Sequence, residues 1–131
     1  MNILNDTYLS LDAKQAWIEQ EASLNEGEPK RIRENCLSAF VIKVKPEVFQ
    51  MRVHNNEDDI IDSRIHIQNL TEILKEEDLD PVTIYAIGSE YYLIEGHHRY
   101  QAYRATLGSE KSRAGKVPVT LFKGTPKEAI L

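Results

Sequence analysis

The N-terminal part of the chain has apolar residues at helical spacing. Leu9, Ala13 and Trp17 recur every four residues, as positions on one face of an α-helix do. Ser10 stands immediately before this run, and serine is among the residues that most often accept a hydrogen bond at a helix N-cap. The pattern predicts an amphipathic helix over residues 11–25.

A second helical pattern occupies the middle of the chain. Ile67 and Leu74 share one face of this segment, and Asp62 or Ser63 stands where an N-cap is expected. The pattern predicts a helix that runs to about Glu77.

Two segments have the alternation of apolar and polar residues that is typical of strands. Residues 40–44 form one, and Val117, Val119 and Leu121 mark another. Pro118 lies within the second segment and cannot donate a backbone hydrogen bond. We therefore expect this strand either to lie at a sheet edge or to begin at the proline.

A hairpin and a third helix follow one another directly. Residues 82–87 and 91–94 are rich in β-branched and aromatic residues and are joined through Gly88, which predicts an antiparallel pair. Gly96 interrupts the pattern just after the second strand. The helical spacing that follows ends near Gly108, a typical C-terminal residue.

These elements, with a short helix over residues 126–131, predict one α+β fold. We expect a small mixed β-sheet, with a β-hairpin leading into a helix, packed by three to four helices. A length of 131 residues suits a single core. Residues 1–38 are expected to form an N-terminal amphipathic helix and linker, and residues 39–131 the main domain.

Composition narrows the classes of function. A net charge of -5 gives no general attraction to DNA or to anionic membranes. No apolar stretch approaches the roughly 20 residues that span a bilayer, and no signal-peptide pattern is present, so we expect a cytoplasmic protein. The single cysteine, Cys36, has apolar neighbours and is expected to be buried without a catalytic role.

Polar residues are concentrated at the turn between the hairpin and the third helix. Gly96 lets the backbone bend sharply, and the helix N-terminus that follows attracts phosphate. Arg99 offers a fork of donors, while His97 and His98 can donate to a phosphate or accept from a ribose hydroxyl. Glu95 can hold Mg²⁺ or accept a proton.

Other interpretations of this turn remain open at this point. Arg99 could instead pair with an acidic side chain on a neighbouring helix. Zinc binding is disfavoured, because adjacent histidines lie about 100° apart on a helix. His66, on the second predicted helix, has no partner at ligand spacing and is assigned no role.

Residues 91–104, followed by residues 117–119, resemble the core motif of the ParB/sulfiredoxin superfamily. The likeness extends upstream to Gln50 and Arg52, which lie where ParB-like domains carry a glutamine-x-arginine loop, and it covers residues 39–131. It implies a ParB/sulfiredoxin-like fold. In this superfamily the matching turn holds nucleotide phosphates, so the resemblance implies Mg²⁺ with ATP, CTP or ADP.

The resemblance also implies roles for particular residues. Glu95 is the implied metal ligand or catalytic base. The implied nucleotide-binding residues lie in the turn and in the upstream loop: Gln50, Arg52, Gly96, His97, His98 and Arg99.

Departures from the superfamily pattern exclude some activities. His97 stands at the position of sulfiredoxin's catalytic cysteine, so reduction of a sulfinic acid is not expected. No basic recognition helix of a helix-turn-helix follows the motif, so sequence-specific DNA binding by this chain alone is not expected.

Three hypotheses of function follow. The first is a ParB-like nucleotide-binding domain, with or without hydrolysis, in a plasmid or phage partition-type or regulatory context. The second is a nuclease or small-molecule phosphotransferase that uses Glu95. The third is a non-catalytic module that forms a homodimer or binds a partner through the helix around Trp17.

Overall fold

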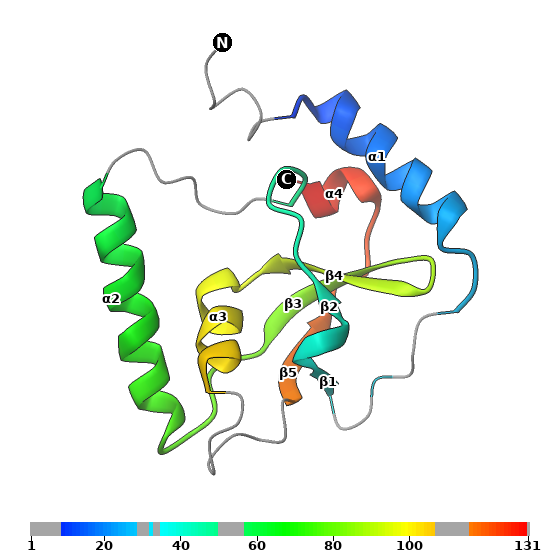
Figure 1. Ribbon diagram of the computed structural model, residues 1–131. Coiled ribbons are helices and arrows are strands. Elements are labelled where there is room, and N and C mark those ends of the chain that lie inside the picture. Colours follow the sequence, from blue (N-terminus) through cyan, green and yellow to red (C-terminus); the bar gives the residue numbers. More distant parts are fainter. Residues whose placement is uncertain (1–8, 29–31, 33–34, 50–56, 107–115, 131) are drawn as a thin grey trace.

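The computed structural model describes residues 9–28, 32, 35–49, 57–106 and 116–130, and in the helix that begins at residue 57 the side chains are described from Ile61 onward. Gln50 and Arg52 therefore lie outside the described residues, as does Gly108. Figure 1 shows the arrangement of the chain.

The described part contains four α-helices, one short 3₁₀ helix and five strands. In chain order they are α1 (Leu11–Leu24), β1 (Cys36–Ser38), the 3₁₀ helix η2 (Ala39–Val41), β2 (Ile42–Lys43), α2 (Glu57–Leu74), β3 (Val82–Ile87), β4 (Glu90–Glu95), α3 (His97–Ala105), β5 (Lys116–Leu121) and α4 (Pro126–Ile130).

The strands form one mixed sheet in the order β1-β5-β3-β4-β2. β3 and β4 form the antiparallel hairpin, and β3 pairs in parallel with β5 on its other side. β1 is antiparallel to β5, and β2 is parallel to β4. The expected α+β class, with a mixed sheet, a hairpin leading into a helix and up to four helices, is confirmed.

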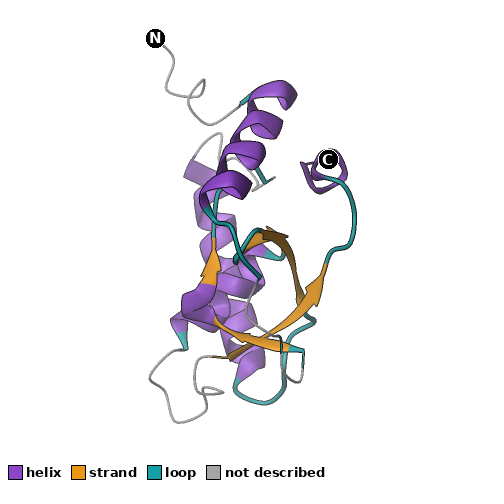
Figure 2. Cartoon of the chain, turned by 90° about the vertical axis from the view of Figure 1, so that its right-hand side faces the viewer, coloured by secondary structure: helices purple, strands orange, loops and turns teal. Residues whose placement is uncertain are grey.

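Alternating residues of the hairpin belong to two separate apolar cores. On β4, Tyr91 and Leu93 join one core while Tyr92 and Ile94 contribute to the other. Successive side chains of a strand point to opposite faces, so the two cores lie on the two faces of the sheet. Figure 2 shows the strands curving through the middle of the molecule, with helices above and behind them.

Helix α3 is fixed to the first face by two buried tyrosines. The Tyr100 hydroxyl donates to the backbone carbonyl of Ala39 at 2.8 Å. The Tyr103 hydroxyl accepts from the backbone N–H of Leu79 at 3.1 Å. These bonds tie α3 to η2 and to the segment before β3, so the helix is anchored to two other parts of the chain.

Helix α1 covers the second face, and its predicted cap is confirmed. The Ser10 hydroxyl accepts from the N–H of Ala13 at 3.1 Å. Ile18 is buried, and the Trp17 ring meets the Tyr92 ring edge-on, with 5.2 Å between the centroids. The apolar face of this helix is therefore packed against its own chain; the division expected at residue 38 remains a prediction.

The strand expected over residues 40–44 is largely wrong. Ser38 caps a 3₁₀ turn through a 3.2 Å bond from the N–H of Phe40, and the strand that follows has only two residues. Since the Tyr100 hydroxyl binds the carbonyl of Ala39, the contact that fixes this turn comes from a residue far away in the sequence.

The edge position expected from Pro118 is also wrong. Strand β5 begins two residues before the proline and lies inside the sheet, between β1 and β3. Pro118 pairs with Cys36 of β1, which is only three residues long. Because the ladder is so short, the missing proline donor costs little here. Cys36, expected to be buried, is half-buried.

Helix α2 begins at Glu57, earlier than expected, so Asp62 and Ser63 lie within the helix and neither is its N-cap. It ends at Leu74, close to the predicted end, and α3 ends at Ala105 with Thr106 as its C-cap.

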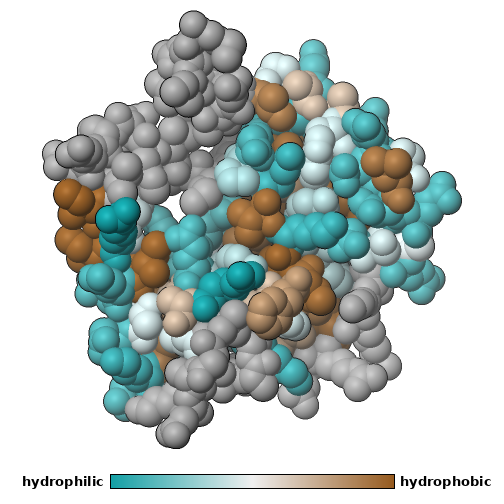
Figure 3. Space-filling model, in the orientation of Figure 1, coloured by the Kyte–Doolittle hydropathy of each residue, from teal (hydrophilic) through white to brown (hydrophobic). Residues whose placement is uncertain are grey.

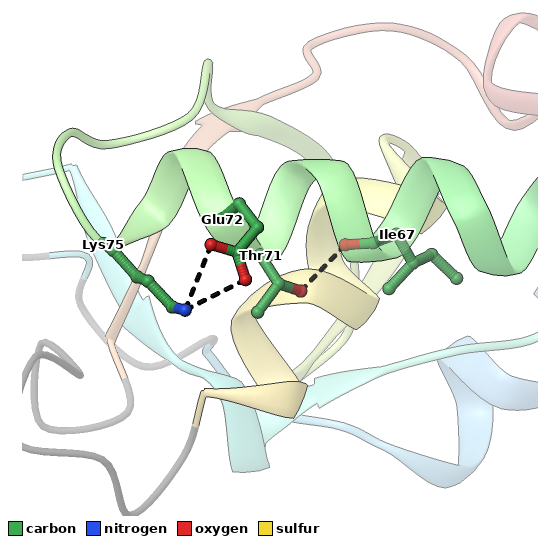
Figure 4. A network of polar contacts seen from close by, with 4 residues as sticks. All are labelled: Ile67, Thr71, Glu72 and Lys75. Atoms are coloured by element: carbon green, nitrogen blue, oxygen red, sulfur yellow. Dashed lines mark hydrogen bonds and ion pairs between the residues drawn. The ribbon is translucent and has the colours of Figure 1, made fainter.

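Helix α2 lies beside α3 and carries polar contacts of its own. Figure 4 shows the Thr71 hydroxyl donating to the carbonyl of Ile67 at 2.8 Å and Lys75 paired with Glu72 at 2.9 Å. Ile61 and Ile65 are about half exposed on the same helix (49% each). Brown apolar side chains mark this edge of the molecule in Figure 3.

Among the described helices, none has the length and apolar character needed to cross a membrane.

Candidate functional site

Gly96 forms the turn between β4 and α3 and caps the helix in a left-handed conformation, with φ of +93°. A Cβ at this position would lie 2.9 Å from Val82 Cγ1. Glycine is therefore required both by the backbone angle and by the packing of the first core. The sequence prediction of a glycine turn at this position is confirmed.

The turn presents a helix N-terminus without a side-chain cap. Gly96 makes no side-chain cap bond, and the first helical bond runs from the N–H of Tyr100 to the carbonyl of Gly96 at 2.8 Å. The first turn of an α-helix leaves its N–H groups outside the helical ladder and carries a partial positive charge. This geometry suits an anionic ligand.

Arg99 lies over the turn. Its Nη1 donates to the backbone carbonyl of Pro81 at 3.0 Å, and its Nη2 is 3.0 Å from the position that a Gly96 Cβ would take. The carbonyl uses one of the five guanidinium N–H donors. Among the described residues, Arg99 thus bonds a backbone carbonyl and not the carboxylate that the competing interpretation required, so its positive charge lies beside the helix N-terminus.

His98 connects α3 to α2. Its Nε2 is hydrogen-bonded to the Ser63 hydroxyl at 3.2 Å, and its ring meets the His66 ring edge-on, with 5.0 Å between the centroids. Ser63 is buried, with 7% of its surface exposed. The second helix therefore reaches the turn through two side chains.

His97 is buried at the base of the turn. Only 9% of the His97 surface is exposed to solvent, and its Nε2 has no hydrogen-bond partner among the described residues. Burial, followed by the charge of His98, lowers the pKa of His97 from 6.5 to about 4. His97 is therefore neutral at physiological pH, and can donate or accept a hydrogen bond but supplies no positive charge.

The turn borders a cavity of about 480 Å³. Residues 95–99 form one side of it, and His66, Leu70 and Asp80 form the other. Glu95, Gly96 and His97 also border a second cavity of about 450 Å³, which Phe122 and Glu128 help to line. The structure brings together the five turn residues that the sequence singled out.

Sequence reasoning missed the α2 side of the cavity. His66 was assigned no role, and Ser63 was one of two candidates for a helix cap, with Asp62, yet His66 and Ser63 both contact His98. Ser63 and His98 lie 35 residues apart. No local sequence signal joins them, because the contact depends on how α2 and α3 pack. Gln50 and Arg52, expected to close over the ligand, lie outside the described residues.

The donors at the turn fit a magnesium ion only in part. Among the described residues, no group of three or more His, Cys, Asp or Glu side chains is arranged to hold a metal ion. Glu95 and Asp80 both line the first cavity, however. Since Mg²⁺ is usually bound by one or two carboxylates together with phosphate oxygens and water, these residues could hold it once a phosphate ligand is present.

Comparison with known proteins finds similarity in fold. No protein-family model matches the chain, and no curated protein matches it. One similar solved structure is the C-terminally truncated chromosome-partitioning protein ParB from Caulobacter crescentus complexed with CTP-gamma-S, with 15% identity, a TM-score of 0.48, and coverage of 72% of this chain and 47% of that one.

Two further structures are similar. Sulfiredoxin from Arabidopsis thaliana has 20% identity and a TM-score of 0.49 over 71% of this chain and 88% of that one. The Caulobacter ParB complexed to the centromeric parS site has 15% identity and a TM-score of 0.44 over 72% of this chain and 42% of that one. The chain spans less than half of the ParB structures. These structures are of the same two kinds of protein, ParB and sulfiredoxin, that the sequence motif resembles.

Proposed function

We propose that the turn of residues 95–99 binds the phosphates of a nucleoside di- or triphosphate. The observation that carries this proposal is the cavity of about 480 Å³ directly in front of the α3 N-terminus, where Gly96 leaves the backbone uncovered by a side-chain cap. Cavities of roughly 300–1,000 Å³ are of a size that takes small-molecule ligands and cofactors.

The charges around the cavity support an anionic ligand at the turn itself. Arg99 supplies a permanent positive charge beside the helix N-terminus, and the imidazoles of His97 and His98 add hydrogen-bonding groups. Glu95 and Asp80 bring negative charge to the same cavity. Since a phosphate would be repelled by these carboxylates alone, we propose that the nucleotide binds together with Mg²⁺.

Titration of the full chain with nucleotides tests the proposal. ATP, CTP, ADP and GTP would each be added by isothermal calorimetry with Mg²⁺ and again with EDTA. Adenosine and cytidine serve as controls that lack phosphate. We expect binding of at least one nucleotide, weakened by EDTA, and no binding of the nucleosides. The absence of binding by all four nucleotides with Mg²⁺ would refute the proposal.

Glu95 favours a second, catalytic candidate. Its side chain is exposed at the end of β4 and borders both cavities, so it can reach a ligand in either. As a general base it would take a proton from the hydroxyl or water that attacks a phosphorus atom of the ligand. The bond from that phosphorus to the leaving oxygen would then break, while Arg99 stabilises the negative charge that develops on the phosphate. Nuclease and phosphotransferase activities are both of this class.

Replacement of Glu95 separates the binding and catalytic candidates. For a Glu95 that acts as the base while Asp80 holds the metal ion, we expect Glu95→Gln to abolish phosphate release and DNA cleavage while nucleotide affinity changes by less than about threefold. Glu90→Gln, at the opposite end of the same strand, is the matched control. If the wild-type protein binds nucleotide but releases no phosphate and cleaves no DNA, the binding function is retained and the catalytic function is excluded.

A further inference from the structure

Ser63 occupies an unusual position for a polar residue. It lies within α2, and 7% of its surface remains exposed, although the neighbouring Asp62 and Arg64 are exposed. A buried hydroxyl is costly unless it is hydrogen-bonded. Its oxygen lies 3.2 Å from Nε2 of His98, on the first turn of α3.

We infer that Ser63 is a positioning residue for the phosphate site, holding the His98 imidazole against α2 so that the cavity is built jointly by the two helices. This inference rests on the proposed function. His98 lines the cavity, and a rotatable ring would lose conformational freedom each time it bound a ligand. The bond to Ser63 restricts the ring beforehand, which is the physical basis of preorganisation.

A second contact restricts the same ring. The His66 imidazole meets His98 edge-on, with 5.0 Å between centroids, and His66 and Leu70 continue the cavity wall along α2. The ring of His98 is therefore held by a hydrogen bond and by packing, and both come from α2.

The chemistry of serine fits a site for an anion. A hydroxyl is uncharged and can either donate to or accept from an imidazole nitrogen. An aspartate in the same place would orient the ring equally well but would add a negative charge beside the ligand. The structure thus has a neutral orienting group where a charged one would oppose phosphate binding.

A double-mutant cycle tests this role. We expect Ser63→Ala to weaken the binding of the nucleotide found in the wild-type screen by about three- to tenfold. His98→Ala should weaken it by at least as much, and the double variant should match His98→Ala within about twofold. Thr71→Val, which removes another hydroxyl from α2, is the matched control and should bind as the wild type does.

The outcomes are distinguishable. A role confined to α2 packing would leave the effect of Ser63→Ala intact in the His98→Ala background, and that result would overturn the inference, as would unchanged affinity of Ser63→Ala. Thermal unfolding accompanies each variant, and Ser63→Cys replaces Ser63→Ala in the cycle if the alanine variant unfolds. A wild-type chain that binds no nucleotide would refute the proposed function itself.

Discussion

The Arg99 guanidinium donates to the backbone carbonyl of Pro81 at 3.0 Å, joining the first turn of α3 to the residue that precedes β3. This bond fixes the direction of a side chain that would otherwise extend into solvent. It also keeps the positive charge beside Gly96, where the proposed phosphate binds. The effect of the guanidinium position on nucleotide binding can therefore be tested separately from the effect of its charge.

Arg99→Lys is expected to weaken nucleotide binding by about tenfold, because lysine keeps the charge but loses the fork that contacts both a carbonyl and a phosphate oxygen. Calorimetric titration measures the change. The control is Arg104→Lys on the same helix, where the guanidinium lies 5.5 Å from the Phe40 ring centroid, away from the cavity. Equal losses in both variants would contradict a specific role for Arg99.

Gly96→Ala is expected to lower the free energy of unfolding by about 1–3 kcal/mol, since the substitution forces a side chain into a left-handed backbone. The new Cβ would also lie 2.9 Å from Val82 Cγ1 and 3.0 Å from Arg99 Nη2. Urea denaturation measures the loss. Gly27→Ala is the control: φ is also positive there, but the nearest atom lies 3.8 Å from the added Cβ. A smaller loss at Gly96 than at Gly27 would argue against this packing.

The stability of the fold should depend on pH through His97. Its folded-state pKa of about 4 lies below the unfolded value of 6.5, so the unfolded state binds the proton more readily between these values. The contribution of His97 to the free energy of unfolding is therefore complete above pH 6.5 and is lost as pH falls toward 4. It amounts to roughly 2 kcal/mol after allowance for partial solvation.

Urea denaturation at several pH values between 7 and 4 measures this loss. Because carboxylates titrate in the same range, the comparison is between the wild type and His97→Gln, whose stability should fall less over the interval. The exposed His66, replaced by Gln, is the control and should follow the wild type. Parallel curves for the wild type and His97→Gln would show that His97 does not contribute.

Trp17→Ala is expected to destabilise the fold by about 2–4 kcal/mol, because the ring packs against Tyr92 and Phe49. Leu24→Ala removes a side chain that is 68% exposed and should change stability by less than about 0.5 kcal/mol. Thermal unfolding compares the two. Equal effects would place the α1 face outside the core and favour the homodimer hypothesis, which size-exclusion chromatography of the full chain tests directly.

The sequence predicted the parts of the fold whose signals are local. The hairpin follows from runs of β-branched and aromatic residues on both sides of Gly88, and the Gly96 turn from a glycine between a strand and a helix. In contrast, η2 is held by the Tyr100 hydroxyl, and a contact between residues so far apart leaves no trace in local periodicity.

The candidate site divides in the same way. Residues 95–99 are consecutive, so one turn brings them together and the sequence suffices to identify them. His66 and Leu70 of the opposite side come from α2, and the pairing of Ser63 with His98 depends on the packing of two helices. Interior placement of β5 was missed because the partner strand of Pro118, β1, is three residues long and has little signal of its own.

The C-terminal end of α1 is joined to the hairpin loop: the N–H of Ser89 donates to the carbonyl of Asn25 at 2.8 Å, and a Cβ on Gly88 would overlap that carbonyl. Figure 1 shows the loop reaching beneath the helix. A peptide of residues 9–28 should therefore be mostly unstructured alone, since isolated helices of this length are marginal in water. Mixed with a fragment of residues 32–131, it should rebind and become helical, making the chain suited to a split-protein complementation assay.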